Sequence, residues 1–140
     1  MPSSAPDIEF TDAPSSELID FLTSKINQET SEHGQASPFA FYIRDNHGSV
    51  VAGANGFLIY GTIYTDQLWV DASHRGQGLA RNIMDKVHAF GQSKGCRFAT
   101  IQTMSFQKAV HFYERLGYAT DFTRAGYVNN SQCLFMRKPL

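Results

Sequence analysis

The chain has 140 residues, of which 42% are apolar and 18% charged, and its formal net charge is −1. This length predicts a single domain over residues 1–140, with residues 1–6 as a loose tail. A nearly neutral chain lacks the basic surface that nucleic acid requires, and no apolar stretch approaches the roughly 18 residues of a membrane span. The N-terminus has neither the basic region nor the apolar core of a secretory signal. Cys96 and Cys133 match no metal-ligand spacing, so we expect no metal and reduced thiols in a cytoplasmic protein. From the charge and the apolar pattern we expect no nucleic-acid or membrane partner.

The N-terminal part of the chain suits a short strand followed by a helix. Residues 8–10 fit the strand, and residues 12–16 offer several N-cap candidates together with Pro14 for a first helical turn. The helix ends before Gly34, and its apolar residues recur at helical spacing with polar residues opposite. These apolar residues are Leu18, Ile19, Phe21, Leu22 and Ile26. We therefore predict a surface helix with one buried face.

Three antiparallel strands are predicted next. Residues 39–43 are rich in aromatic and β-branched side chains, and a second strand starts at Ser49. The pair Asn55-Gly56 is ambiguous, because it suits either a hairpin turn or a bulge inside a longer strand. The longer strand is favoured, since Tyr60-Gly61 offers another turn before the strand 62–70.

A glycine-bearing loop follows the third strand and leads into a helix. It contains Arg75, Gly76 and Gly78, and apolar residues then recur at helical spacing as far as Phe90. Free backbone N–H groups and the helix dipole make such a loop a ready anion site. Glycine has no Cβ atom, so the backbone can approach a phosphate closely.

The remainder predicts a parallel strand, a helix and two terminal strands. Gly95 ends the previous helix, and the strand 97–103 should lie parallel to the strand ending at Val70. Ser105 is the expected cap of a helix that Gly117 ends. Terminal strands are expected over residues 118–122 and 132–136. Two strands that both end at helix starts make a fork in which a ligand can bind.

Two motifs carry a family resemblance. The run Arg75-Gly76-Gln77-Gly78-Leu79-Ala80 fits Arg/Gln-x-x-Gly-x-Gly/Ala, and residues 109–118 resemble a second motif, Ala-Ile-x-x-Tyr-x-x-x-Gly-Phe. Together they resemble the GCN5-related N-acetyltransferase (GNAT) superfamily over about residues 39–122. The resemblance implies an α/β (α+β) fold with a mixed, mostly antiparallel sheet of six to seven strands, splayed at the middle, and three to four helices on its two faces.

The resemblance also implies acetyl-CoA as co-substrate. Its pyrophosphate would bind backbone N–H groups of Gly76, Gln77, Gly78 and Ala80. Arg75 either adds charge there or holds the loop from its outer side. The pantetheine arm would bond to the backbone near Leu68 and Val70, in the manner of an added strand.

In the family, a tyrosine at the position of Tyr113 is commonly proposed to protonate the departing thiolate, and a neutral phenol suits that role. Tyr113 is alternatively a packing residue of the helix. The family often has Asn where this chain has Phe106, so that cofactor contact is either lost or supplied by Ser105 or Gln107. Asp66 is the candidate base, since it is the strand's only carboxylate before the loop. Strand alternation puts Tyr64, Asp66, Leu68 and Val70 on one face unless a bulge intervenes.

These inferences predict an N-acetyltransferase that moves the acetyl group to an amine of a small molecule or protein in a ternary complex. The alternative is a non-catalytic module that binds acyl-CoA. Family members are often dimers, and the C-terminal strands are the contact we expect for a homodimer.

Overall fold

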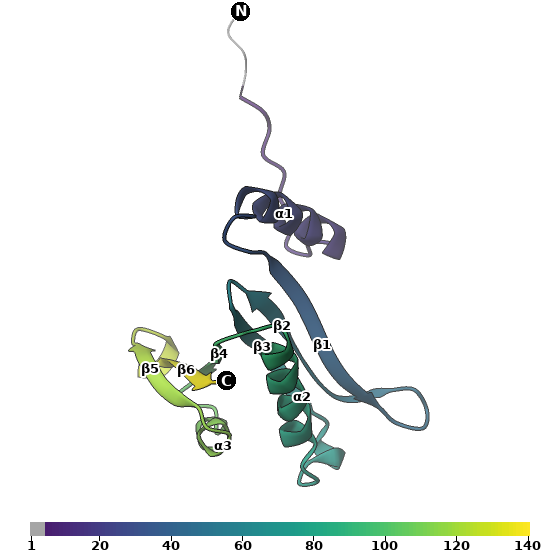
Figure 1. The fold of residues 1–140 in the computed structure, drawn as a ribbon, viewed down its shortest axis with the longest axis vertical. Coiled ribbons are helices and arrows are strands. Elements are labelled where there is room, and N and C mark those ends of the chain that lie inside the picture. The colour runs from purple at the N-terminus through teal and green to yellow at the C-terminus, as the bar shows by residue number, and fades with distance from the viewer. Residues whose placement is uncertain (1–4) are drawn as a thin grey trace, which may run out of the picture.

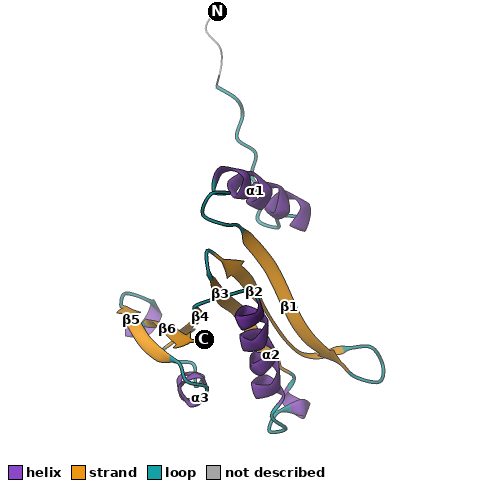
Figure 2. Ribbon diagram, in the orientation of Figure 1, coloured by secondary structure: helices purple, strands orange, loops and turns teal. Residues whose placement is uncertain are grey.

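The computed structural model describes residues 5–140, so the tail predicted for residues 1–6 lies mostly outside the described residues. Six strands form one sheet in the order β1-β2-β3-β4-β6-β5, and three helices accompany it (Figures 1 and 2). The helices are α1 (Ser16–Glu29), α2 (Leu79–Ser93) and α3 (Val110–Arg115). The strands are β1 (Ala36–Arg44), β2 (Val50–Ile59), β3 (Thr62–Val70), β4 (Phe98–Met104), β5 (Ala119–Arg124) and β6 (Cys133–Pro139). In residues 5–140, no helix is long and apolar enough to cross a membrane.

The predicted fold class is confirmed. Strands β1, β2 and β3 are antiparallel neighbours, and α2 carries the chain over to β4, which pairs with β3 in parallel. Such a crossover is what a strand–helix–strand sequence predicts. The C-terminal strands complete the sheet, with β6 inserted between β4 and β5. The result is an α+β mixed sheet.

The pair Asn55-Gly56 marks a bulge within β2–β3 and not a hairpin, as predicted. Asn55 pairs with Gln67 and Gly56 with Thr65, so Asp66 is the extra residue on β3. A Cβ atom on Gly56 would lie 1.8 Å from the Tyr64 carbonyl oxygen. Only glycine therefore lets the two backbones come this close.

This bulge overturns the alternation expected for β3. The extra residue reverses the alternation, so that Leu68 and Val70 lie on the α2 face while Tyr64 lies on the other. Asp66 stays with Tyr64, whose hydroxyl donates a hydrogen bond to its carboxylate at 3.3 Å. The four side chains predicted to share one face are thus divided between two.

The sheet splays where β3 and β4 part. Their parallel pairing covers only residues 62–65 of β3 and 98–101 of β4. Beyond these residues, β3 continues to Val70 alongside β2, and β4 continues to Met104 alongside β6. Two half-sheets therefore diverge on either side of an opening that starts at the bulge.

The core lies between the sheet and helices α2 and α3. Ile83, Met84 and Val87 of α2 are buried against Ile63 and Ile101 of the sheet. Gly95 and Gly117, both in left-handed conformation, follow the ends of α2 and α3, as predicted.

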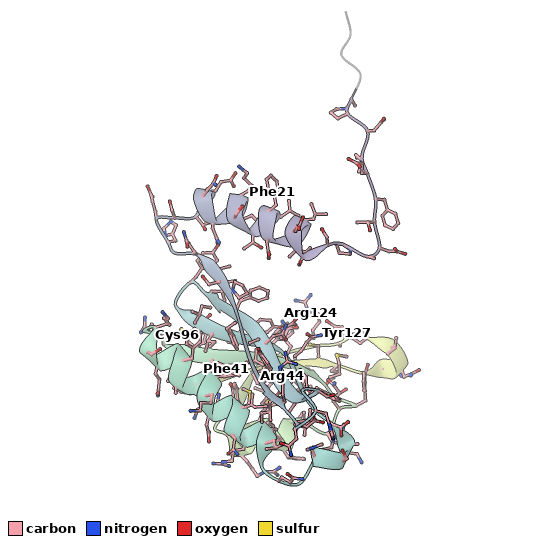
Figure 3. The ribbon with its side chains drawn as sticks, turned by 90° about the vertical axis from the view of Figure 1, so that its right-hand side faces the viewer. Phe21, Phe41, Arg44, Cys96, Arg124 and Tyr127 are labelled. Carbon is pink, nitrogen blue, oxygen red and sulfur yellow. The ribbon has the colours of Figure 1, made fainter. Side chains whose placement is uncertain are left out.

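Helix α1 differs most from expectation. Ser15 caps it by accepting a hydrogen bond from the Leu18 amide at 3.1 Å, but none of its side chains is buried. The predicted buried face is therefore wrong, and Figure 3 shows α1 with the labelled Phe21 apart from the strands. Residues 8–10 form no strand.

The start of α3 also differs. The helix begins at Val110, five residues after Ser105, so Ser105 is not its cap. Ser105 instead exchanges hydrogen bonds with Gln132: its amide donates to the Gln132 carbonyl at 2.8 Å, and its hydroxyl accepts from the Gln132 amide at 2.9 Å. The segment between β4 and α3 is consequently a turn that joins the start of β6.

Candidate active site

The glycine loop brings free amide groups to the start of α2. Gly76 and Gly78 have φ values of 79° and 77°, a left-handed conformation that favours glycine. Asn82 donates to the Gly78 carbonyl at 3.0 Å and is the first residue to bond within the helix. The amides of Leu79, Ala80 and Arg81 therefore have no helical acceptor, and they point out of a positive helix end. Loop and helix together can bind an anion.

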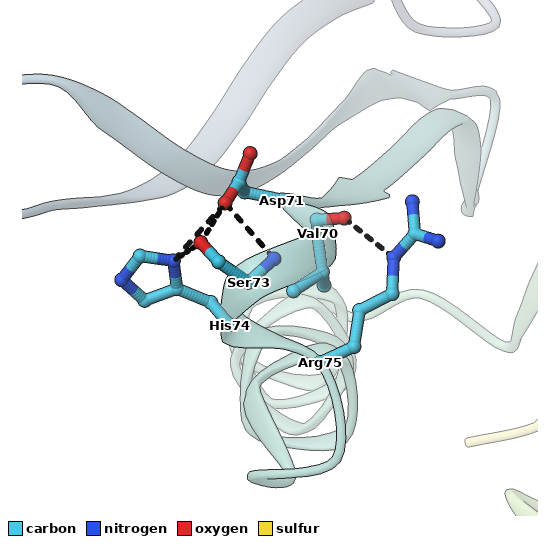
Figure 4. Close-up of polar contacts among 5 residues, drawn as sticks. All are labelled: Val70, Asp71, Ser73, His74 and Arg75. Atoms are coloured by element: carbon cyan, nitrogen blue, oxygen red, sulfur yellow. Dashed lines mark hydrogen bonds and ion pairs between the residues drawn. The ribbon is translucent and has the colours of Figure 1, made fainter.

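Arg75 turns back towards the strand it follows. Its Nε donates to the Val70 carbonyl oxygen at 2.9 Å, so the side chain ties the loop to the end of β3 (Figure 4). Of the two roles considered for Arg75, the geometry is that of a residue holding the loop. The guanidinium charge still remains beside the loop.

A second polar cluster fixes the exit from β3, and the sequence did not single it out. The Asp71 carboxylate accepts hydrogen bonds from the Ser73 amide at 3.2 Å and from the Ser73 hydroxyl, and His74 Nδ1 lies 3.3 Å from it (Figure 4). The hydrogen bond from Ser73 and the contact with His74 lower the pKa of Asp71. Asp-x-Ser at the start of a turn was the available signal.

The open edge of β3 presents backbone groups to the splay. The Asp71 amide donates to the Val51 carbonyl at 2.8 Å, so Asp71 faces β2. In an antiparallel ladder the residues alternate, which turns the amides and carbonyls of Leu68 and Val70 away from β2, towards the opening. No β4 residue pairs with either of them.

Tyr113 lies on α3, in the core on the α2 side of the sheet. It is 8% exposed and packs edge-on against Phe112 and Tyr118, with ring centroids 5.2 and 5.5 Å away. Burial raises the pKa of Tyr113 to about 12, so the phenol is neutral at physiological pH. Its neighbour Tyr118, in contrast, shares a 2.8 Å hydrogen bond with His88 Nε2.

Asp66 lies on the other face of the sheet, in a hollow of about 250 Å³ at the splay. The hollow is also lined by Tyr64, Gln102, Thr103 and Tyr127. Burial, followed by the charge of Asp66, raises the pKa of Tyr64. A carboxylate and a phenol are thus joined at the edge of the opening.

The predicted site residues form three groups. Gly76, Gln77, Gly78 and Ala80 gather with Arg75 at the start of α2. Asp66 and Tyr113 lie on opposite faces of the sheet and do not line one hollow. Phe106, at the position where the family often has Asn, is 64% exposed. Nearby, Gln107 accepts from the Met104 amide at 2.8 Å and is therefore occupied in holding the turn.

Next to the splay, another hollow of about 340 Å³ lies over β1, β2 and β3. Tyr42, Gln67 and Trp69 line it together with Asn55, whose side-chain oxygen is buried without a hydrogen-bond partner among the described residues. A buried acceptor without a donor is costly, so this oxygen suits a ligand N–H. Sequence reasoning did not single out Asn55 or Gln67, because a buried acceptor without a partner is visible only in the folded sheet.

Comparison with known proteins agrees with the motifs. The model of the Acetyltransferase (GNAT) family matches residues 5–118. Blasticidin-S acetyltransferase of Streptomyces morookaense is 33% identical over 81 residues, which cover 57% of this chain and 59% of that protein. Thialysine N-epsilon-acetyltransferase of Mus musculus is 32% identical over 88 residues, covering 58% and 51%. The chain therefore spans between half and three fifths of these curated relatives.

Solved structures share the whole fold. A crystal structure from Agrobacterium tumefaciens, of a protein proposed to be an acetyltransferase, superposes with a TM-score of 0.76 at 22% identity. The match covers 96% of this chain and 100% of that one. The family match extends over most of the chain and includes the glycine loop, and acetyl-CoA is the co-substrate typical of that family. The chain belongs to the GNAT acetyltransferase family.

Proposed function

We propose that this protein transfers the acetyl group of acetyl-CoA to an amine by direct attack in a ternary complex. The observation that carries the proposal is the splay between β3 and β4, which opens next to the glycine loop. A thioester held there is accessible from both faces of the sheet. An amine can therefore arrive from one face while the thiolate departs on the other.

The loop and the strand edge supply the cofactor site in this proposal. Amides of Gly76, Gln77, Gly78 and Ala80 donate to the pyrophosphate, and Arg75 holds the loop in place through Val70. Leu68 and Val70 bond to the amides of the pantetheine arm, as an added strand would. A backbone N–H near Val70 then stabilises the oxyanion that forms on the thioester carbonyl.

The two proton transfers in this proposal take place on opposite faces of the sheet. Asp66 lies on the open face, where it accepts a proton from the attacking amine. Tyr113 lies on the helix face, where its neutral phenol donates to the sulfur as the C–S bond breaks. A pKa raised by burial makes Tyr113 a weaker acid, but it also keeps the proton on the phenol at neutral pH. The stabilising hydrogen bond to a developing thiolate is strong in such a dry site.

The acceptor is a small-molecule amine in this proposal. The side-chain oxygen of Asn55 has no hydrogen-bond donor among the described residues, so it can accept from an amine N–H. Tyr42 and Trp69 offer aromatic surface for an apolar or cationic group. Two relatives are named for blasticidin S and for the ε-nitrogen of thialysine, which supports an amine of this class.

The test is release of free CoA thiol from acetyl-CoA in the presence of a panel of amines. We expect at least one amine to give turnover, and Tyr113→Phe to lower kcat by about 10²–10³ with an unchanged Kd for acetyl-CoA. Phe112→Tyr is a matched control, because it adds a hydroxyl on the adjacent helix position and should leave turnover within a few-fold.

Either of two results would redirect the proposal. Binding of acetyl-CoA without turnover of any amine would favour the non-catalytic module. An unchanged kcat in Tyr113→Phe would remove Tyr113 as the acid and leave the cofactor site intact.

A further inference from the structure

The Tyr113 hydroxyl is not held by a hydrogen bond of its own. It makes none of the hydrogen bonds found within residues 5–140, and the buried side-chain oxygen without a partner there belongs to Asn55. The hydroxyl of Tyr113 is therefore reached from outside the core and is free to donate. Because the hydroxyl is unanchored, the direction in which it donates is set by the packing around its ring.

Tyr118 contacts Tyr113 through both its backbone and its ring. Its amide donates to the Tyr113 carbonyl at 3.0 Å, across the turn that Gly117 makes with a φ of 100°. The two rings pack edge-on, with centroids 5.5 Å apart and an angle of 73° between their planes. Phe112 also packs edge-on against Tyr113, but it is the preceding residue of the same helix. Tyr118 is therefore the neighbour that fixes Tyr113 from outside α3.

The hydroxyl of Tyr118 is a departure from the second motif. The motif has phenylalanine at this position, so its pattern requires the ring and this chain adds the hydroxyl. A buried hydroxyl destabilises a protein unless it has a hydrogen-bond partner. Here the partner is His88 of α2, whose Nε2 lies 2.8 Å from the hydroxyl oxygen. Both residues are buried, so this hydrogen bond lies inside the core.

His88 is held firmly in place on α2. It lies on the buried side of the helix with Met84 and Val87, and its ring packs on that of Tyr118 with centroids 5.6 Å apart. Burial keeps the imidazole neutral at physiological pH, because it lowers the pKa of His88 to about 4. A neutral imidazole has one donor and one acceptor nitrogen, so it can share a hydrogen bond with a neutral phenol without burying a charge.

We propose that His88 is a positioning residue for acetyl transfer, which orients Tyr113 through Tyr118. The hydrogen bond from His88 fixes the Tyr118 ring, and the ring and amide of Tyr118 fix Tyr113. This inference rests on the proposed function, in which Tyr113 protonates the departing thiolate. Orientation matters because a misplacement of about 1 Å can remove much of the effect of a catalytic group.

Steady-state kinetics of single variants separates positioning from substrate binding. Tyr118→Phe removes the hydrogen bond and keeps the ring, and His88→Leu removes the same bond from the other side. We expect each to lower kcat by about fivefold, the change that one hydrogen bond supports, with KM for acetyl-CoA and for the amine unchanged. His88→Gln can still bond to the Tyr118 hydroxyl, so its kcat should stay within about twofold of the parent protein.

A double-mutant cycle tests whether the effect passes through Tyr113. Tyr113→Phe leaves no hydroxyl to orient, so adding Tyr118→Phe to it should lower kcat no further. An equal loss from Tyr118→Phe in both backgrounds would overturn the proposal, because it would show a general structural effect. So would a slow Tyr113→Phe beside an unchanged Tyr118→Phe. An unchanged kcat in Tyr113→Phe would instead contradict the proposed function, and the positioning role with it.

Ring mobility provides a second readout that needs no substrate. NMR of the full chain with ¹³C-labelled tyrosine rings, with the Tyr113 signal assigned from Tyr113→Phe, measures how fast that ring flips. We expect Tyr118→Phe and His88→Leu to raise the flip rate by about fivefold or more, and His88→Gln to leave it unchanged.

The matched control is Tyr60→Phe, which removes a hydroxyl that is hydrogen-bonded to Thr30 at 3.2 Å, outside the site. It should change neither kcat nor the flip rate of Tyr113. An unchanged flip rate in Tyr118→Phe would overturn the proposal even if no amine is acetylated. Circular dichroism verifies that each variant keeps the fold.

Discussion

Two neighbouring tyrosines show how single residues acquire different roles in this protein. Tyr118 is hydrogen-bonded to His88, so its hydroxyl is committed to the core. The ring of Tyr113 packs edge-on against Phe112 and Tyr118. Both lie in the second motif, Tyr113 at its tyrosine position and Tyr118 at its phenylalanine position. The resemblance singled out Tyr113, and the structure adds that burial raises its pKa to about 12.

His88 predicts how stability depends on pH. Burial, together with the charge of Lys138 and against that of Asp85, lowers the pKa of His88 to about 4. The unfolded chain therefore takes up a proton near pH 6.5 that the folded chain takes up only near pH 4. Stability from the neutral imidazole is complete above pH 6.5 and is lost as the pH falls towards 4.

We expect urea unfolding to show a loss of about 2 kcal/mol from this group between pH 7 and pH 4, after allowance for solvent screening. His88→Gln retains a side chain that can bond to Tyr118 and removes the titration, so its stability should vary less over the same range. Equal pH dependence in the two proteins would contradict the assignment.

At the scale of elements, the bulge between β2 and β3 decides the geometry of the site. It turns Leu68 and Val70 to the helix face, leaves Asp66 on the other face and precedes the splay. Gly56 permits it, because any Cβ there would meet the Tyr64 carbonyl oxygen at 1.8 Å.

Gly56→Ala should therefore lower the free energy of unfolding by about 3 kcal/mol or prevent folding. Gly53→Ala is the matched control on the same strand: its Cβ would lie 3.2 Å from Cβ of Tyr42, which needs only a small shift. We expect it to cost about 1 kcal/mol or less in urea unfolding. A similar cost for both variants would mean that the bulge adapts to a side chain.

The sequence predicted elements well where local patterns dominate. Gly95 and Gly117 correctly predicted the ends of α2 and α3. The Asn55-Gly56 pair was correctly assigned to a bulge in a long strand. Sequence reasoning did not locate the residue that bulges outwards on β3, because register depends on pairing with β2 and not on β3 alone. The division of Asp66 from Leu68 and Val70 followed from that register.

At the scale of the whole molecule, helix periodicity predicted α1 but not its surroundings. An apolar stripe predicts that one side of a helix packs against another surface, but it does not identify that surface. Two hydrogen bonds between the Asn27 side chain and the Ala36 backbone tie α1 to the start of β1, and they join residues nine positions apart.

The central claim is that the glycine loop and the splay hold acetyl-CoA, and its most direct test is ligand-dependent unfolding. Acetyl-CoA or CoA at 100 times its Kd should stabilise the protein by about 2.7 kcal/mol, and ATP or NADH should not. Gly78→Ala should weaken that binding by about tenfold or more, since it puts a Cβ atom on the loop that we propose binds the phosphates. Gly95→Ala at the other end of α2 has nearly the same φ and equally open space, so it controls for backbone strain. Stabilisation by ATP or NADH alone, or equal binding by both variants, would contradict the claim.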